Sequence, residues 1–207
     1  MDERAFVERV GRVRAIAIIR ASSKRRARIA MEAAVDGGFQ IVEFTLNTPG
    51  AIELVRLFSR RRGLTVGAGT VLHARDAAAA VDAGASFLVS PVLDEAVLRR
   101  AGRLGVPLIP GTHTPTEMWR AHDAGCPIVK LFPSPGPAYL RYCLGPMPFL
   151  RIVPTSGVDP RNARAHLDAG AFAVGLGGAL FAERDVAAED AGAIRRRARS
   201  ILRAIAR

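Results

Sequence analysis

Residues 123–132 read DAGCPIVKLF, a stretch in which the end of a helix gives way to an apolar strand. Its glycine stands where a helix ends on a left-handed residue, and β-rich residues follow within a few positions. The same Asp-x-Gly signature occurs at 36–38, 82–84 and 168–170, so that successive aspartates are 46, 41 and 45 residues apart. Each repeat is long enough for two strand–helix pairs. The four repeats therefore predict eight parallel strands.

Short β-rich runs alternate with helical stretches along the chain. The expected strands cover residues 15–20, 41–45, 65–68, 87–90, 107–110, 128–131, 151–155 and 172–175. Eight parallel strands close naturally into a barrel. We therefore expect an α/β fold, a (β/α)8 TIM barrel with an extra N-terminal helix, as a single domain over residues 1–207. Its expected parts are an N-terminal helix at 1–14, a barrel core at 15–181 and a C-terminal helix at 186–207.

A doubly wound open sheet is the alternative fold for such an alternating chain. Its fingerprint is a Gly-x-Gly-x-x-Gly segment after the first strand, at the site where a dinucleotide binds. The first strand of this chain runs instead into Arg20-Ala21-Ser22-Ser23. The barrel is therefore the favoured fold.

The composition is that of an ordinary globular protein, with 49% hydrophobic and 24% charged residues. No uncharged apolar run approaches the roughly 20 residues that cross a bilayer, so we expect no membrane partner. The N-terminus lacks the basic and then apolar layout of a signal peptide. Cys126 and Cys143 lack the spacing of metal ligands, and we expect them to be free thiols in a reducing cytoplasm.

The formal net charge of +11 raises the question of nucleic-acid binding. Only Lys24 and Lys130 of the 30 basic residues are lysines, and the arginines are scattered over the polar faces of most expected helices. Two tyrosines and one tryptophan leave few side chains for base stacking. We therefore expect no nucleic-acid partner, although the positive field would attract an anionic substrate.

Lys130 lies in Ile128-Val129-Lys130-Leu131-Phe132, a run that otherwise predicts a buried strand. A buried ammonium costs several kcal/mol unless it is paired or deprotonated. Two structural interpretations are open. Lys130 either pairs with a carboxylate or points outward between the helices. A desolvated lysine can also lose its proton and attack a ketone, which a guanidinium cannot do. In a chain that uses arginine almost everywhere else, we predict that Lys130 is a nucleophile.

Glu43, in Ile41-Val42-Glu43-Phe44-Thr45, is the matching polar residue of an apolar strand. Seven residues separate each repeat aspartate from Glu43, Val89, Lys130 and Gly175, which predicts equal heights on alternate strands. Glu43 and Lys130 are thus expected in one layer of the barrel. Glu43 is either the ion-pair partner of Lys130 or a group that moves protons next to a Schiff base, and the two roles can coexist.

Several polar or glycine-rich segments end the expected strands, at the catalytic face of a barrel. Gly67-Ala68-Gly69-Thr70 predicts a tight turn with backbone donors and a hydroxyl, and Pro110-Gly111-Thr112 is similar. Arg20 ends the first strand, where its planar guanidinium can grip a carboxylate. Thr155-Ser156-Gly157 and Gly175-Leu176-Gly177-Gly178 follow strands seven and eight, where barrels bind phosphate. The first two segments also fit a purely structural turn, and Arg20 also fits an ordinary surface residue.

The four histidines, His73, His113, His122 and His166, are scattered without metal-ligand spacing. We therefore expect no metal site. His113 lies in the expected mouth of the barrel, where it either touches substrate or is an ordinary surface residue.

Six segments, taken in order, form a further pattern. They are AIIR at 17–20, VEFTLNTP at 42–49, VGAGTVL at 66–72, VSP at 89–91, IPG at 109–111 and VKLFPS at 129–134. Together they resemble the family of 2-keto-3-deoxy-6-phosphogluconate (KDPG) and 4-hydroxy-2-oxoglutarate (KHG) aldolases. The resemblance covers about residues 15–181, and the lysine segment is its specific part.

This resemblance implies a homotrimeric class I aldolase without a cofactor, acting on a small keto-acid substrate. Lys130 would form the Schiff base, Glu43 would be the acid and base, and Thr70 would lie near the pyruvate carboxylate. The other implied substrate contacts are Arg20, Asn47, Pro91, Gly111 and Thr155, and the implied phosphate contacts are Ser156, Gly157, Gly177 and Gly178.

Three positions depart from the family pattern. Many members have arginine where this chain has Asn47, and the branch similar to the 6-phosphogalactonate enzymes combines asparagine there with an arginine like Arg20. Ser156 stands in a segment that usually reads Thr-Gly-Gly, and Ala179 stands where serine is frequent. We expect a phosphorylated sugar acid as substrate, with a shorter or unphosphorylated keto acid as the alternative. Two other functions stay open, a phosphate-binding barrel isomerase and a non-catalytic basic binding protein on the same scaffold.

Overall fold

The computed structural model of the chain describes residues 2–206. Over these residues the strands are β1 (Ala15–Ile19), β2 (Ile41–Thr45), β3 (Thr65–Gly69), β4 (Phe87–Val89), β5 (Leu108–Ile109), β6 (Gly111–Thr112), β7 (Val129–Leu131), β8 (Ile152–Pro154) and β9 (Val174–Leu176). All neighbouring strands pair in parallel. They form one sheet in the order β5-β4-β3-β2-β1-β9 and a second in the order β6-β7-β8.

The two sheets join into one closed barrel. On one side β5 and β6 are two halves of a single strand, interrupted at Pro110 because proline has no N–H to give to a ladder. On the other side a parallel bridge between Thr155 and Gly175 and a bond from the Phe172 N–H to the Ile152 carbonyl join β8 to β9. The expected (β/α)8 barrel is thus confirmed, and no open edge is left in this part of the chain.

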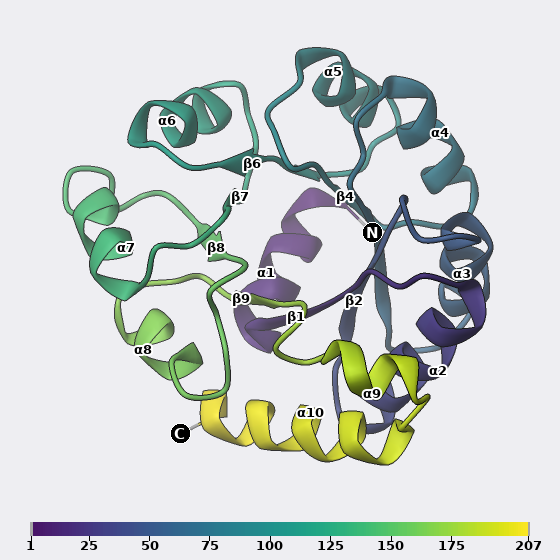
Figure 1. Cartoon of the computed structure of the whole chain (residues 1–207). Coiled ribbons are helices and arrows are strands. Elements are labelled where there is room, and N and C mark those ends of the chain that lie inside the picture. The colour runs from purple at the N-terminus through teal and green to yellow at the C-terminus, as the bar shows by residue number, and fades with distance from the viewer. Residues whose placement is uncertain (1, 207) are drawn as a thin grey trace.

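Helices surround the barrel, as Figure 1 shows in a view along its axis. The surrounding helices are α2 (Lys24–Asp36), α3 (Ala51–Phe58), α4 (Ala74–Asp82), α5 (Glu95–Arg103), α6 (Pro115–Asp123), α7 (Pro137–Leu144), α8 (Ala163–Asp168), α9 (Glu183–Ala187) and α10 (Ala191–Ala206), whereas α1 (Glu3–Val13) lies at the centre of this view. The outer core lies between the strands and these helices, and it is rich in alanine and aliphatic side chains.

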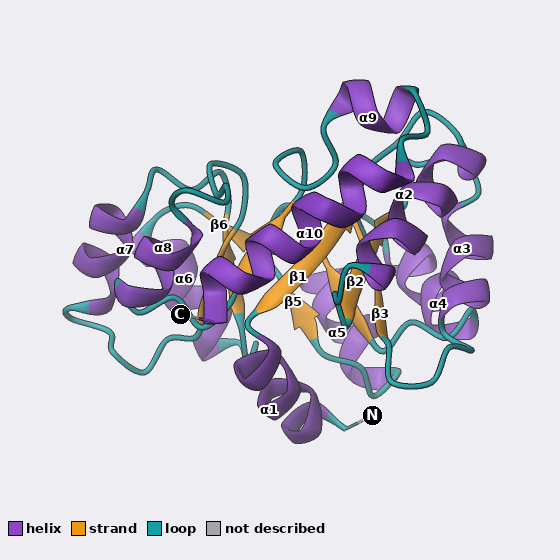
Figure 2. Cartoon of the chain, turned by 90° about the horizontal axis from the view of Figure 1, so that it is seen from below, coloured by secondary structure: helices purple, strands orange, loops and turns teal. Residues whose placement is uncertain are grey.

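The extra N-terminal helix closes the bottom of the barrel. Asp2 caps it by accepting the Ala5 N–H at 2.7 Å, and its apolar stripe ends inside the barrel. Phe6 and Val10 are fully buried in a cluster with inward-pointing strand residues, and Phe6 stacks on Phe87 at 4.9 Å between ring centroids. Figure 2 shows α1 at the end of the barrel opposite α9. Only the end formed by the carboxyl ends of the strands is therefore left for a ligand.

The observed elements differ from the expected ones at the chain ends. Residues 183–187 form the separate helix α9, and α10 begins only at Ala191, whereas one helix was expected over 186–207. Glu189 is left-handed, with φ 54°, and Asp190 then accepts the Ala193 N–H at 2.8 Å, so the chain turns and starts a new helix there. The N-terminal helix spans 3–13 instead of 1–14, and residues 1 and 207 lie outside the described part.

Candidate active site

A cavity of about 630 Å³ opens at the carboxyl ends of the strands. It holds ten of the predicted site residues: Arg20, Glu43, Thr70, Pro91, Lys130, Thr155, Ser156, Gly157, Gly177 and Gly178. These residues come from β2 and β7 and from the loops that follow β1, β3, β4, β8 and β9. Segments far apart in the sequence thus meet in one place, as parallel barrel topology requires.

Two predicted residues do not line this cavity. Asn47 is exposed and borders a separate surface hollow beside α3. Gly111 is buried in β6, and a Cβ atom there would lie 2.1 Å from the Pro91 carbonyl oxygen. Gly111 therefore allows the Pro91 loop to pack close to β6.

The cavity also contains residues that the sequence analysis did not assign to the site. They are Ile18, Thr45, Phe132, Val158, Asp159, Ala179 and Phe181. The two-residue period of a strand places Thr45 and Phe132 on the same side as Glu43 and Lys130, and the same rule extends from Arg20 to Ile18. Val158, Asp159 and Phe181 follow no such period because they lie in irregular loops.

Lys130 lies at the centre of β7, between Gly111 on β6 and Val153 on β8. It is only 9% exposed, and its Nζ lies 4.6 Å from the centre of the Phe132 ring. Burial lowers the pKa of the Lys130 ammonium, the nearby Glu43 carboxylate opposes this shift, and Arg20 adds to it. A lowered pKa makes the neutral, nucleophilic amine more accessible near neutral pH.

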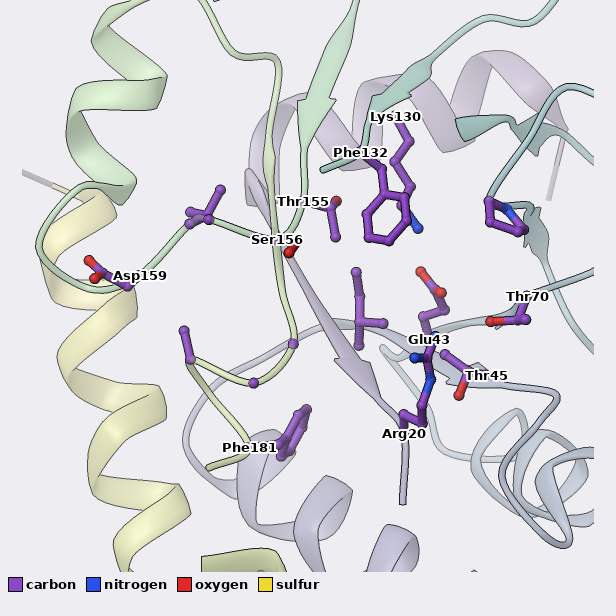
Figure 3. Close-up of a pocket in the computed structure, with 17 residues that line it drawn as sticks. Arg20, Glu43, Thr45, Thr70, Lys130, Phe132, Thr155, Ser156, Asp159 and Phe181 are labelled. Atoms are coloured by element: carbon purple, nitrogen blue, oxygen red, sulfur yellow. The ribbon is translucent and has the colours of Figure 1, made fainter. Parts of the chain in front are cut away.

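Glu43 extends from β2 toward Lys130 across the cavity (Figure 3). It is 2% exposed, and burial raises the pKa of its carboxyl, while Lys130 and Arg20 act in the opposite direction. A carboxyl with a raised pKa can both give and take a proton. The predicted pair is thus brought together from strands on different sides of the barrel.

Gly69 on β3 leaves the room that the Glu43 carboxylate occupies. A Cβ atom at this position would lie within bonding distance of Glu43 Oε1. A Cβ atom at Gly67 would likewise overlap the ring of Phe87, one layer lower in the barrel. The tight turn expected at Gly67-Ala68-Gly69-Thr70 is not found at these glycines, because β3 continues beyond its expected end at residue 68 and contains both of them. They are small in order to fit inward-pointing side chains from neighbouring strands.

Two of the four non-glycine residues with positive φ among residues 2–206 lie at the cavity. Thr70 has φ 58° and Ser156 has φ 60°, values in the left-handed region that side-chain-bearing residues rarely adopt. A β-branched residue such as Thr70 is the more unfavourable of the two, and such positions cost of order 1–3 kcal/mol each. Strain of this kind persists mainly where a function requires the geometry.

Uncommitted polar groups also face the cavity. Thr155 Oγ1 is buried and has no hydrogen-bond partner among residues 2–206. Over the same residues, the backbone amides of Ser156, Gly157, Gly178 and Ala179 donate to no protein acceptor. An unpaired buried hydroxyl costs about 1–3 kcal/mol. These donors are therefore available to an anionic ligand.

Other potentially reactive groups lie away from the cavity. Burial raises the pKa of the Cys126 thiol to about 12, so this sulfur is protonated and unreactive at neutral pH. Between residues 2 and 206 no three His, Cys, Asp or Glu side chains gather into a possible metal site. No helix in this part of the chain is long and apolar enough to cross a membrane.

The fold and cavity together define a barrel protein with a desolvated lysine facing a carboxylate at its catalytic end. Residues 7–197 match the sequence model of the aldolase family described as KDPG and KHG aldolase. Because this match covers most of the chain, the chain belongs to that family.

Individual relatives agree with this assignment. The chain is 41% identical to 2-dehydro-3-deoxy-phosphogluconate aldolase of Pseudomonas aeruginosa over 140 residues, 66% of this chain and 64% of the relative. It is 33% identical to 2-dehydro-3-deoxy-6-phosphogalactonate aldolase of Escherichia coli over 171 residues, 80% of this chain and 83% of the relative. The matched part thus spans a little under two thirds of the Pseudomonas protein.

Solved structures show the same fold. A native KDPGal structure superposes with a TM-score of 0.82 at 31% identity, covering 92% of this chain and 93% of the other. A KDPG aldolase from Legionella pneumophila, with pyruvate captured as a covalent carbinolamine intermediate, gives 0.83 at 27% identity, covering 91% and 94%.

The Gly69 geometry generates a prediction. Gly69→Ala should displace the Glu43 carboxylate, which is the flexible end of a side chain, without unfolding the barrel. A misplacement of about 1 Å at a reacting group can cost on the order of 10²-fold in rate. For a reaction that depends on the Glu43 carboxyl, we expect the rate to fall by about that factor while the melting temperature changes little. The measurements are a steady-state activity assay and thermal unfolding.

Gly102→Ala is the matched control, because a Cβ atom at Gly102 in α5 meets no atom within 4 Å. Full activity of Gly69→Ala would show that the room beside Glu43 is not needed.

Proposed function

We propose that this chain is a class I aldolase. It cleaves a 2-keto-3-deoxy-6-phospho sugar acid, KDPG or its galactonate epimer, to pyruvate and glyceraldehyde 3-phosphate, and 4-hydroxy-2-oxoglutarate to pyruvate and glyoxylate as a second reaction. The observation that carries the proposal is the buried Lys130 amine opposite Glu43 in the cavity. The covalent carbinolamine named for the Legionella relative supports the same chemistry.

The reaction begins at Lys130. Its neutral amine attacks the C2 ketone of the substrate and forms a carbinolamine. Loss of water then gives a protonated Schiff base, whose positive charge withdraws electrons from C3. Burial of Lys130 favours the neutral amine needed for the first step, because it lowers the pKa of the ammonium.

Glu43 is placed to move the protons, directly or through a water molecule. Its carboxylate takes the proton of the C4 hydroxyl while the C3–C4 bond breaks, which releases the aldehyde and leaves an enamine on Lys130. The Glu43 carboxyl then returns a proton to C3, which becomes the methyl group of pyruvate. Hydrolysis of the Schiff base frees pyruvate and restores the amine.

The proposal also assigns the ends of the substrate. Thr70 and Pro91 lie beside the lysine end of the cavity, where they would contact the pyruvate part, and Arg20 supplies a cation for a carboxylate. The free amides after β8 and β9 form the proposed phosphate site. Asn47 is exposed in this structure, and its contact with substrate stays a prediction.

A phosphorylated substrate is favoured in spite of the two departures at this site. Ala179 lacks the hydroxyl that could give one more hydrogen bond to a charged group, worth about 1.5–3 kcal/mol or roughly 10- to 100-fold in affinity. Ser156 has a left-handed backbone, with φ 60°, which a glycine would adopt without strain, and its N–H donates to no backbone carbonyl among residues 2–206. The backbone donors are thus retained.

Homotrimer formation and a cytoplasmic location complete the proposal. Trp119 and Phe149 are each 47% exposed, and their rings meet edge to face at 6.3 Å with His122 beside them. Exposed apolar patches are typical of protein contacts. Two free, buried cysteines are consistent with a reducing compartment.

Borohydride trapping tests the Schiff base. Pyruvate with borohydride should attach one reduced pyruvyl group to Lys130, located by peptide mass spectrometry. Lys130→Met should abolish trapping and cleavage with the fold intact by circular dichroism. Lys24→Arg is the control, because Lys24 is the other lysine of the chain. Labelling at Lys24, or active protein without labelling, would refute the mechanism and favour the isomerase or the binding protein.

Glu43→Gln tests the proton transfers. We expect trapping at Lys130 to persist, while cleavage and deuterium exchange at the pyruvate methyl group slow by about 10²-fold or more. The Glu43 charge raises the pKa of Lys130, so its removal should shift the acid limb of the trapping rate to lower pH. Glu8→Gln on the exposed face of α1 is the control. Normal methyl exchange would leave Glu43 a structural partner only.

Sedimentation analysis tests the assembly. Wild-type protein should sediment as a trimer, and Trp119→Glu should shift it toward monomer by placing a charge in the apolar patch. Leu57→Glu is the control, because Leu57 is similarly exposed, at 40%, on α3 across the barrel. A monomeric wild type would refute the trimer.

A further inference from the structure

His166 is a buried polar residue that the proposed chemistry does not use. It lies on α8 and is 0% exposed. Its Nδ1 lies 3.0 Å from the Asn162 carbonyl oxygen, and its Nε2 lies 3.3 Å from Ser134 Oγ. A carbonyl only accepts, so Nδ1 is the donor in the bond to Asn162, and Nε2 is paired with the Ser134 hydroxyl. Both nitrogens of this ring are thus committed.

The two partners of His166 hold the loop that follows β8. The backbone N–H of Ser134 donates to the Thr155 carbonyl at 3.1 Å and to the Ser156 carbonyl at 2.9 Å. From the other side, Asn162 Nδ2 donates to the Gly157 carbonyl at 2.8 Å. The loop carrying the free amides of Ser156 and Gly157 is therefore fixed at both ends.

The loop after β7 and the loop after β8 pack closely against each other. A Cβ atom at Gly157 would lie 2.6 Å from the Ser134 carbonyl oxygen, so the two backbones are in direct contact. Ser134 follows Lys130 by four residues, on the loop that leaves β7. The strand that carries the proposed nucleophile and the loop that carries the proposed phosphate donors are consequently tied together. His166 contacts the Ser134 side chain on one of these loops.

Such an arrangement is expected to persist only when all its members are paired. An imidazole or hydroxyl buried without partners destabilises the folded state, whereas a satisfied buried network is rigid. A variant without the ring nitrogens of His166 leaves the Ser134 hydroxyl without its hydrogen-bond partner. The Ser156–Gly157 loop is then free to shift. Because four backbone groups must point at one anion, a small shift weakens several bonds together.

We propose that His166 is a positioning residue that acts through Ser134 and Asn162. It holds the Ser156–Gly157 loop at a fixed place relative to Lys130 and thereby sets the affinity for the phosphate end of the substrate. This inference rests on the proposed aldolase function and its phosphate site.

The test compares a phosphorylated substrate with the same sugar acid lacking only the phosphate. His166→Phe and Ser134→Ala should raise KM for KDPG about tenfold, the equivalent of one hydrogen bond. Their kcat for KDPG, their kcat/KM for 2-keto-3-deoxygluconate and their borohydride trapping with pyruvate should stay at wild-type values. His166→Gln keeps a polar side chain that can hydrogen-bond to Ser134. Its KM for KDPG should therefore be close to the wild-type value.

Leu167→Ala separates positioning from simple destabilisation. Leu167 is the buried neighbour of His166 on α8, and its truncation should lower the melting temperature while leaving KM for KDPG unchanged. A loss in His166→Phe that is equal for both substrates, or an unchanged KM, would overturn the positioning role. Wild-type protein that traps pyruvate but does not distinguish the two substrates would overturn the phosphate site, and this inference with it. Absence of trapping would overturn the aldolase function itself.

Discussion

The burial of one amine beside one carboxyl at the centre of the barrel is the constraint on which the site depends. Each group alone is costly in an apolar interior, and each partly offsets the cost of the other. The pair therefore has to be introduced from strands that bring both groups to the same height without exposing them. A closed barrel with its bottom filled by α1 provides this environment, because solvent reaches the pair only from the catalytic end. The outer helices support this geometry at a distance.

Much of the fold follows from local sequence signals. The Asp-x-Gly repeat marks helix ends, and Gly38, Gly84, Gly125 and Gly170 all have the positive φ that this interpretation requires. The break between α9 and α10 could not be predicted, because Glu189 gives no sign of a left-handed conformation and Asp190 becomes a cap only once the chain has turned. Short-range patterns thus identify most elements, whereas a reversal made by ordinary residues requires the packed structure.

The residues of the site likewise divide into those that the sequence reveals and those that only the packed structure reveals. Lys130 and Glu43 are visible in the sequence because a charge in an apolar strand is chemically conspicuous. The function of Gly69 is not visible, since a glycine after an apolar residue has the same appearance in a turn as in a strand that leaves room for a neighbour. His166 lacks metal-ligand spacing like the other histidines, and only the structure shows both its nitrogens paired inside the molecule. Interactions between loops distant in sequence leave no periodic signal.

The unusual use of arginine in place of lysine can be connected to this central pair. Arginine keeps its charge at any physiological pH, so a surface rich in arginine gives a constant positive field and adds no second titrating amine near the site. Arg20 is the nearest example. Its charge lowers the pKa of Lys130, which favours the neutral amine, and also lowers the pKa of Glu43, which favours the carboxylate. Desolvation alone would keep both groups neutral, an amine ready to attack beside a carboxyl unable to accept a proton. A fixed cation at the mouth shifts both members toward the forms that the first steps of aldol cleavage require.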